Sequence, residues 1–99
     1  LYERISNTFN ELIEKEEVHT LHFPQEDILK SEREQKERRT AIDRAISLGN
    51  LEHQKVKIYF SDDQGKKRVD TTIWAVTDTA IVLKQNTVLP IHRIHKLEI

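Results

Sequence analysis

The chain has 99 residues, enough for one small domain or for one small domain with an appendage. With 36% hydrophobic and 33% charged residues it has a globular but charge-rich composition, and its formal net charge of −1 provides no global field to steer nucleic acid or membranes. The absence of cysteine excludes disulfides, thiolate metal sites and cysteine nucleophiles, and it fits a cytoplasmic setting. No run approaches the roughly 20 apolar residues of a membrane helix, so we expect no membrane association.

The first half, residues 1–50, is predicted to be helical. Apolar residues recur at helical spacing at Ile5, Phe9, Leu12 and Ile13. Thr8 with Glu11 three residues later is typical of a capping box. A short helix is therefore expected near residues 8–17, followed by an extended stretch that ends at Pro24.

A long, charged helix is predicted over about residues 25–48. Pro24 suits a first helical turn, and no helix breaker follows before Gly49-Asn50. Between Lys30 and Thr40 there is no apolar residue to bury, which is typical of a helix crossing open solvent. The alternative is a break near Thr40, where Thr40 and Asp43 would cap a separate helix.

After Asn50 the apolar period changes from 3.6 to 2, which indicates strands. The expected strands and turns are 56–60, a turn at Ser61–Gly65 in which Gly65 takes a positive φ, 66–76, 79–84, a two-residue turn at Gln85-Asn86, 87–89 and 94–99. Five short antiparallel strands with tight turns make a small barrel over residues 51–99. The predicted fold class is therefore α+β, with N-terminal helices followed by a five-stranded antiparallel SH3-like or Sm-like small barrel.

The parity of the strands predicts apolar residues on both faces of the sheet. If Ile58 lies opposite Val69, the residues Val56, Thr71 and Ile73 share their face, while Tyr59, Trp74 and Val76 point the other way. A two-residue turn pairs Leu83 with Val88, beside Ile81, and leaves Ala80, Val82, Leu89 and Ile91 on the opposite face. A cover for the second face is therefore expected, either from the helices or from a partner.

The order KVKIYF, DDQG, VDTTIWAV and TVLPIHRI, with a last strand LEI, resembles the small SH3-like and Sm-like barrels of bacterial proteins, many of them uncharacterised. The most suggestive part is the closing pattern, an apolar-Pro-Ile step followed by Arg-Ile. The resemblance covers about residues 51–99. It implies a helix-plus-barrel architecture.

The candidate partner or nucleic-acid surface consists of one aromatic pair and three nearby cations: Lys55, Lys57, Tyr59, Arg68 and Trp74. Aromatic side chains among cations can stack bases while the cations hold phosphates. The alternative is that Trp74 packs against the helical segment and Tyr59 caps the rim of the barrel. Lys57 opposite Asp70 is in the same way typical of a cross-strand pair.

The other polar motifs are weaker candidates for a functional site. His92 with His95, and His19 with His22, have an HxxH spacing, and His53 lies apart from both; no metal site is expected, because zinc needs three or four ligands. Asp62-Asp63 is ordinary in a turn. The run Lys66-Lys67-Arg68 is expected to be a solvated hairpin, and the corner Pro90–Arg93 looks structural before it looks functional.

These patterns contain no catalytic signature and imply no cofactor, so no enzyme is expected. We expect a non-enzymatic, cytoplasmic interaction module that binds a protein partner or associates with itself. The alternative is a barrel that binds single-stranded RNA through Tyr59, Trp74 and the neighbouring cations.

Overall fold

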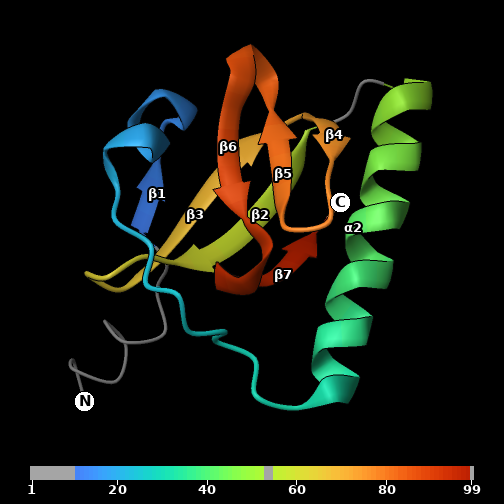
Figure 1. The fold of residues 1–99 in the computed structure, drawn as a ribbon. Coiled ribbons are helices and arrows are strands. Elements are labelled where there is room, and N and C mark those ends of the chain that lie inside the picture. Colours follow the sequence, from blue (N-terminus) through green and yellow to red (C-terminus); the bar gives the residue numbers. More distant parts are fainter. Residues whose placement is uncertain (1–10, 53–54, 99) are drawn as a thin grey trace, which may run out of the picture.

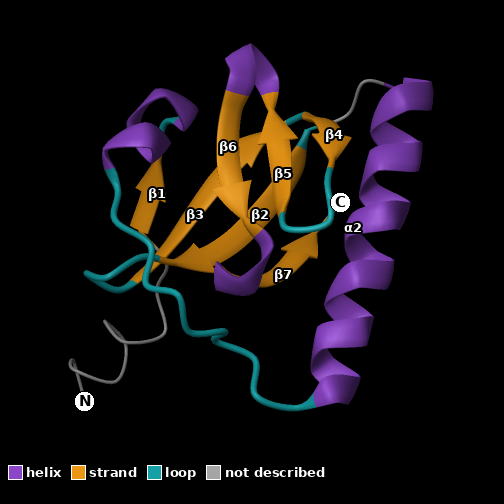
Figure 2. Ribbon diagram, in the orientation of Figure 1, coloured by secondary structure: helices purple, strands orange, loops and turns teal. Residues whose placement is uncertain are grey.

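The computed structural model describes residues 11–52 and 55–98, and its fold is α+β, with one long helix beside two β-sheets (Figures 1 and 2). The described elements, in chain order, are β1 (Glu11–Ile13), the 3-10 helix η1 (Lys15–Thr20), α2 (Glu32–Glu52), β2 (Val56–Ser61), β3 (Lys66–Thr71), β4 (Ile73–Val76), β5 (Ala80–Leu83), η2 (Lys84–Asn86), β6 (Thr87–Pro90), η3 (Ile91–Arg93) and β7 (Ile94–Glu98).

The strands form a four-stranded sheet in the order β1-β3-β2-β7 and a three-stranded sheet in the order β4-β5-β6. β1 runs parallel to β3, and the other strand pairs are antiparallel. The predicted closed barrel of five antiparallel strands is therefore wrong in its strand count and in its closure. One cause is that the predicted strand 66–76 breaks at Thr72, so that its two halves, β3 and β4, belong to different sheets.

The first hairpin has the predicted register. Ile58 pairs with Val69 and Val56 with Thr71, and all four residues are buried. Gly65, in the turn, has a φ of 140°, a conformation that L side chains rarely adopt.

The β5–β6 hairpin differs from the prediction by one residue. Leu83 pairs with Thr87, not with Val88, because the loop has three residues and Gln85 takes a left-handed φ of 65°. Ile81 then pairs with Leu89, and both are fully buried. The prediction that Leu89 and Ile91 line an outer face is therefore wrong, since both lie in the core.

The helix predicted near residues 8–17 is also wrong where the structure can test it. Residues 8–10 lie outside the described part of the chain, 11–13 form β1, and 15–20 form η1. The N-terminus of η1 is stabilised by the backbone N–H of Glu14, which donates to the Glu17 carboxylate at 3.2 Å. Burial of Ile13 and Val18 against the strands outweighs the helical spacing of the apolar residues.

The long helix exists but is displaced toward the C-terminus. α2 begins at Glu32, after Ser31, whose Oγ accepts the Glu34 N–H at 3.1 Å as a cap. It continues through Gly49 to Glu52, so both the predicted start at 25 and the alternative break at Thr40 are wrong.

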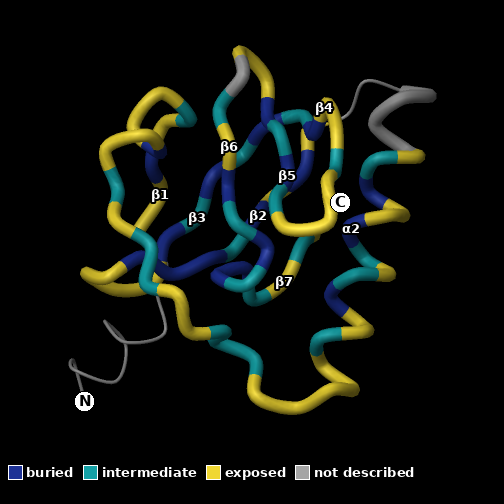
Figure 3. The backbone as a smooth tube through the Cα atoms, viewed as in Figure 1, coloured by how far each residue is buried: buried dark blue, intermediate teal, exposed yellow. Residues whose placement is uncertain are grey.

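The hydrophobic core lies between the two sheets, the helix and η1 (Figure 3). α2 packs against β4 and β7 and contributes Ile42 and Ala45, while η1 packs against β6 and contributes Val18. The fully buried strand residues are Ile58, Phe60, Ile81, Leu83, Leu89 and Ile94. Segments from both halves of the chain therefore share one core.

Buried polar groups fix the corner between β6 and β7. Arg93 donates from Nε to the Ser61 carbonyl at 3.1 Å, and from Nη1 to the Glu26 carbonyl at 2.7 Å. Lys67 is buried, and its Nζ lies 3.0 Å from Oδ1 of Asp62, so the prediction of a solvated hairpin is wrong at Lys67. Arg93 and Lys67 therefore have structural partners.

A second buried pair attaches the segment before α2. The guanidinium of Arg38 donates to both carboxylate oxygens of Asp27, at 2.9 and 2.8 Å, and to the Ile94 carbonyl at 3.2 Å. The Arg38 guanidinium holds the pKa of Asp27 below its ordinary value, although partial burial acts in the opposite direction.

Candidate functional site

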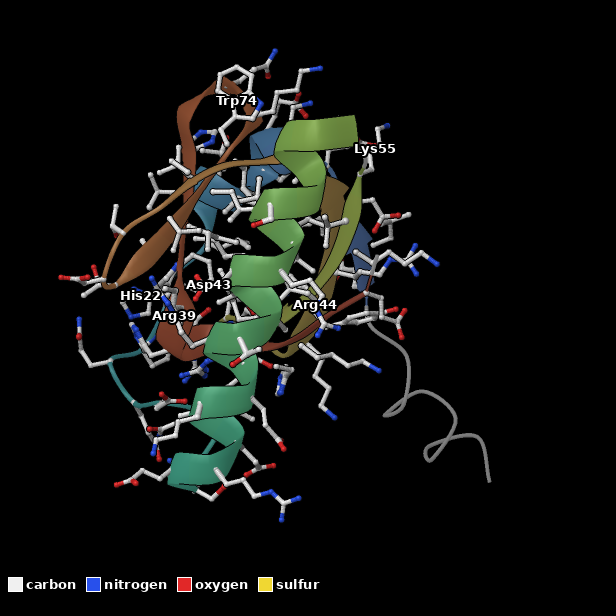
Figure 4. All side chains as sticks on the ribbon, turned by 90° about the vertical axis from the view of Figure 1, so that its right-hand side faces the viewer. His22, Arg39, Asp43, Arg44, Lys55 and Trp74 are labelled. Carbon is white, nitrogen blue, oxygen red and sulfur yellow. The ribbon has the colours of Figure 1, made fainter. Side chains whose placement is uncertain are left out.

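The five predicted site residues do not form one surface. Lys57, Tyr59 and Arg68 lie together on the outer face of the four-stranded sheet. Trp74 belongs to the three-stranded sheet, and Lys55 precedes β2 and lines a separate cavity. In the view of Figure 4, Trp74 and Lys55 lie on opposite sides of the C-terminal end of α2.

The outer face of the four-stranded sheet, here called the Tyr59 face, is made of alternate residues of β2, β3 and β7: Lys57, Tyr59, Lys66, Arg68, Asp70, Lys96 and Glu98. The strand registers arrange these side chains in rows. In one row Lys57 lies between Asp70 and Glu98, and in the next Tyr59 lies between Arg68 and Lys96.

Many charges on the Tyr59 face are already paired. Arg68 Nε lies 3.1 Å from Oδ1 of Asp70, and Lys96 Nζ lies 3.5 Å from Oε2 of Glu98. The Tyr59 hydroxyl donates to Glu98 at 2.9 Å, and this hydrogen bond is the main reason that the pKa of Glu98 is lowered. The Lys96 ammonium lies 4.9 Å from the centre of the Tyr59 ring, so one face of the ring already has a cation above it.

In the row after Tyr59, Lys66 pairs with Ser61, and His95 lies beside Ser61. The β2–β7 register shifts after Tyr59, which pairs with Lys96, whereas Phe60 pairs with Ile94. His95 is therefore the extra residue of a β-bulge, a feature that re-aims a side chain. Its Nε2 lies 2.7 Å from Oγ of Ser61, and burial, together with the positive charge of Lys66, lowers its pKa.

The outer face of the three-stranded sheet, here called the Trp74 face, consists of Trp74, Ala75, Val82 and Val88. Val82 pairs with Ala75 on one side and with Val88 on the other. Trp74 is 53% exposed and Val88 is 52% exposed. About half of the Trp74 side chain is therefore uncovered. The outward position predicted for Val76 is wrong, because Val76 packs against the core.

A cavity of about 290 Å³ lies between β1, the end of β3 and the residue after β5, and contains the predicted residue Lys55. Its lining consists of Leu12, Ile13, Glu14, Lys15, Lys55, Asp70, Thr71, Thr72 and Lys84. The Lys84 N–H donates to the Thr72 carbonyl at 3.2 Å, which connects this cavity to the edge of the three-stranded sheet two residues before Trp74. Lys55 and Lys84 form no ion pair with any residue that the structure describes.

The histidines of the C-terminal corner have separate partners. Nε2 of His92 lies 2.9 Å from the Pro24 carbonyl oxygen, which makes this nitrogen the donor, whereas His95 contacts Ser61. In residues 11–52 and 55–98 no group of three or more His, Asp or Glu side chains is arranged to hold a metal ion. His53 lies outside the described residues.

Sequence reasoning left His95 and Lys96 out of the Tyr59 face and assigned Val88 to the wrong face of the other sheet, whereas Val82 lies on the face opposite Ile81 and Leu83, as predicted. The positions of His95 and Lys96 depend on the pairing of β7 with β2, which strand parity alone does not determine. Val88 was misplaced because the turn was read as having two residues where η2 has three. The exposure of Val88 follows directly from that shift.

Comparisons of the chain with protein-family models, with curated proteins and with solved structures gave no match. Among the described residues, α2 is the only α-helix, and it is too polar to cross a membrane. The candidate functional surfaces are therefore the Tyr59 face and the Trp74 face.

Proposed function

We propose that the chain is a non-enzymatic interaction module whose Trp74 face binds a short segment of a partner protein. The observation that carries this proposal is that Trp74 on β4 and Val88 on β6, separated by β5, are both half exposed on a sheet face that leaves about half of each side chain uncovered. Tryptophan is enriched among the residues that dominate protein interfaces, where it fills a pocket on the partner or receives its apolar side chains.

The size of this face favours a peptide segment over a second copy of the chain. With 53% of Trp74 and 52% of Val88 exposed, the two side chains present roughly 200 Å² of surface. A stable dimer interface removes about 800 Å² from each partner. One or two apolar side chains of a linear segment cover the Trp74 face, whereas a homodimer would need much more apolar surface than it offers.

Charge complementarity defines the chemistry of the segment further. Lys84 follows β5 at the edge of the Trp74 face, and Lys55 shares the adjoining cavity with it. Neither lysine is paired with a described carboxylate. Of the two acids that line the cavity, Asp70 is paired with Arg68 and the Glu14 side chain accepts the Glu17 N–H, so an acidic side chain of the partner would meet the free charges of Lys55 and Lys84. The proposed ligand is therefore a segment with apolar residues beside acidic ones.

The proposal includes a likeness to small SH3-like and Sm-like barrels as the architectural class. It is supported by the order of elements, in which β2, β3 with β4, β5, β6 and β7 follow one another as the five predicted strands do. The break at Thr72, which sends β3 and β4 into different sheets, is compatible with a strongly bent second strand of such a barrel.

A second candidate function is binding of single-stranded RNA on the Tyr59 face. The observation in its favour is that Lys57, Lys66, Arg68 and Lys96 share this face with the half-buried Tyr59. Against it stand Asp70 and Glu98, which pair with two of these cations. Titration with mixed single-stranded RNA at low salt tests this candidate through the Tyr59 and Lys96 resonances, because Trp74 lies on the other sheet.

Selection of peptides from a random library displayed on phage, against the immobilised chain, tests the protein-binding proposal. We expect enriched peptides with apolar and acidic residues, and binding lost in Trp74→Ala but kept in Tyr59→Ala. Tyr59 is a matched control, because it is an aromatic residue on the outer face of the other sheet and lines neither the Trp74 face nor the cavity that contains Lys55 and Lys84. Equal peptide binding by both variants, or no enrichment of peptides, contradicts the proposal. A dimer that is seen in light scattering and is lost in Trp74→Ala would show that the partner is a second copy of the chain.

A further inference from the structure

The basic end of the Tyr59 face contains a second feature, a shallow cavity of about 270 Å³ lined by Tyr59, Lys66, His95 and Lys96. Its lining has three nitrogen-bearing side chains that can carry positive charge and no carboxylate. On the other side of His95 a second cavity is lined by Glu34, Glu37 and Arg38 of α2, and Lys96 lines both cavities. Carboxylates therefore line the cavity toward α2 but not the basic cavity beside Tyr59.

We propose that this basic cavity binds one phosphate-type dianion, held between the ammonium groups of Lys66 and Lys96 and the imidazole of His95. The inference is independent of the peptide proposal, because the cavity lies on the four-stranded sheet and the Trp74 face on the other. Within the described residues the Lys66 ammonium forms no ion pair, so its charge is available to a ligand. The Lys96 ammonium lies 3.5 Å from the exposed Glu98 carboxylate, which also accepts the Tyr59 hydroxyl, so a bound dianion would compete with Glu98 for Lys96.

The imidazole of His95 is held in place by two features of the fold. The β-bulge aims its side chain out of the regular β2–β7 pairing, and Ser61 contacts Nε2 at 2.7 Å. When Nε2 of the neutral ring accepts the Ser61 hydroxyl hydrogen, the ring proton is on Nδ1, where it is available as a donor. When the ring is protonated, both nitrogens donate and the Ser61 oxygen accepts, so the contact persists in both states.

The charges around His95 predict that anion binding and protonation are linked. Burial, followed by the positive charges of Lys66 on β3, Arg93 on η3 and Arg38 on α2, lowers the pKa of His95. The remaining charged groups near the ring are Lys96, Glu34 and Glu37, which line the two adjoining cavities. A bound dianion offsets the repulsion between the cations and the imidazolium, so binding raises the pKa of His95 and falling pH tightens binding.

The test is NMR titration of the full chain with sodium sulfate at constant ionic strength, observing the imidazole resonances of His95. Sulfate remains a dianion over the pH range used, so any pH dependence belongs to the protein. We expect saturable binding that tightens, by up to about tenfold, as the pH falls from about 8 through the pKa of His95, which burial holds below its ordinary value.

Charge-removing variants make the result specific. Lys66→Gln is expected to weaken sulfate binding about fivefold, whereas Lys36→Gln, at an exposed position of α2, and Trp74→Ala leave it unchanged. Both replaced side chains are exposed, so Lys66→Gln and its control are expected to fold. Equal effects of Lys66→Gln and Lys36→Gln, or His95 shifts that sodium chloride reproduces, overturn the proposal.

Two further titrations distinguish the sources of the phosphate group. If inorganic phosphate and adenosine 5′-monophosphate bind equally, the cavity recognises the phosphate alone. If the nucleotide binds more tightly and shifts the Tyr59 ring resonances, a phosphate attached to a base is the source. If neither inorganic phosphate nor adenosine 5′-monophosphate binds in a saturable manner, the proposed site is contradicted.

Discussion

The two sheets of this small protein present outer faces of opposite character. On the Tyr59 face most side chains are charged, and Arg68 and Lys96 are paired with carboxylates two residues along their own strands. On the Trp74 face the side chains are apolar, and Trp74 and Val88 remain half exposed. One face therefore satisfies most of its polar groups internally, whereas the other leaves apolar surface without a described partner, which indicates a docking site.

The difference arises from how the chain covers its own edges. α2 packs along β4 and β7, and η1 packs against β6, so these elements cover edges and the interior side of the sheets. None of the described elements lies over Trp74, which is found beyond the C-terminal end of α2 (Figure 4). Residues that stabilise the fold are therefore distinct from residues that are available to a partner, and substitutions in the two groups are expected to have different effects.

The largest effect is expected at Arg93, on which both faces depend. Arg93→Ala removes hydrogen bonds to the carbonyls of Ser61, Glu26 and Asp62, and leaves these acceptors in a buried corner. We expect a loss of about 4 kcal/mol in the free energy of unfolding, measured by urea denaturation. Arg44→Ala, at an exposed position of α2, is the control and should change stability by less than about 0.5 kcal/mol. Similar stabilities of the two variants would contradict the structural role of Arg93.

A smaller effect with a defined pH dependence is expected at Asp62. Burial acts to raise the pKa of Asp62, but the hydrogen bonds from Lys67 and from the backbone of Gln64 and Gly65 outweigh it and lower the pKa below 3.8. Since the folded-state pKa is the lower one, this stabilisation is present above about pH 4 and is lost as the pH falls through the folded-state value.

Asp62→Asn is accordingly expected to cost about 2 kcal/mol at neutral pH, because it leaves the buried Lys67 ammonium with only the more distant, exposed Glu11 carboxylate at 3.8 Å. The difference between the two proteins should shrink as the pH falls below 3.8. Unfolding free energies measured from acidic to neutral pH check this, and a constant difference at all pH values would contradict the assigned pair.

The smallest effects on stability are expected on the two outer faces themselves. Tyr59→Phe removes one exposed hydrogen bond to Glu98 and should cost about 0.5 kcal/mol. Trp74→Ala should change stability by no more than that, because the indole is half exposed. Thermal unfolding of both variants tests this, and a loss of several kcal/mol in Trp74→Ala would show that Trp74 belongs to the core.

The sequence predicts some features of this fold well and others poorly, for physical reasons. Alternation in Val56, Ile58 and Phe60 located β2, and the register to β3 followed, because one residue of slip would have exposed every apolar side chain. The break at Thr72 has no comparable local signal, since Lys66 to Val76 has strand propensity throughout and only tertiary pairing divides it between two sheets.

The candidate site residues could also be predicted only in part. Lys57, Tyr59 and Arg68 belong to the correctly paired hairpin, so their common face followed from parity. Trp74 follows the break, which moves it to the other sheet, and His95 lies at a bulge that depends on the pairing of β7. Local periodicity determines a hairpin, but the assembly of hairpins into sheets depends on contacts distant in sequence.

The most direct test of the central claim uses the single tryptophan of the chain as a reporter. In the free protein, Trp74 should emit as a solvent-exposed indole and be quenched readily by acrylamide, because it is 53% exposed. Addition of a peptide selected from the displayed library should shift the emission to shorter wavelength and protect the indole from acrylamide, in a saturable manner. Saturable peptide binding with unchanged emission and unchanged quenching would contradict the claim that the Trp74 face is the docking surface.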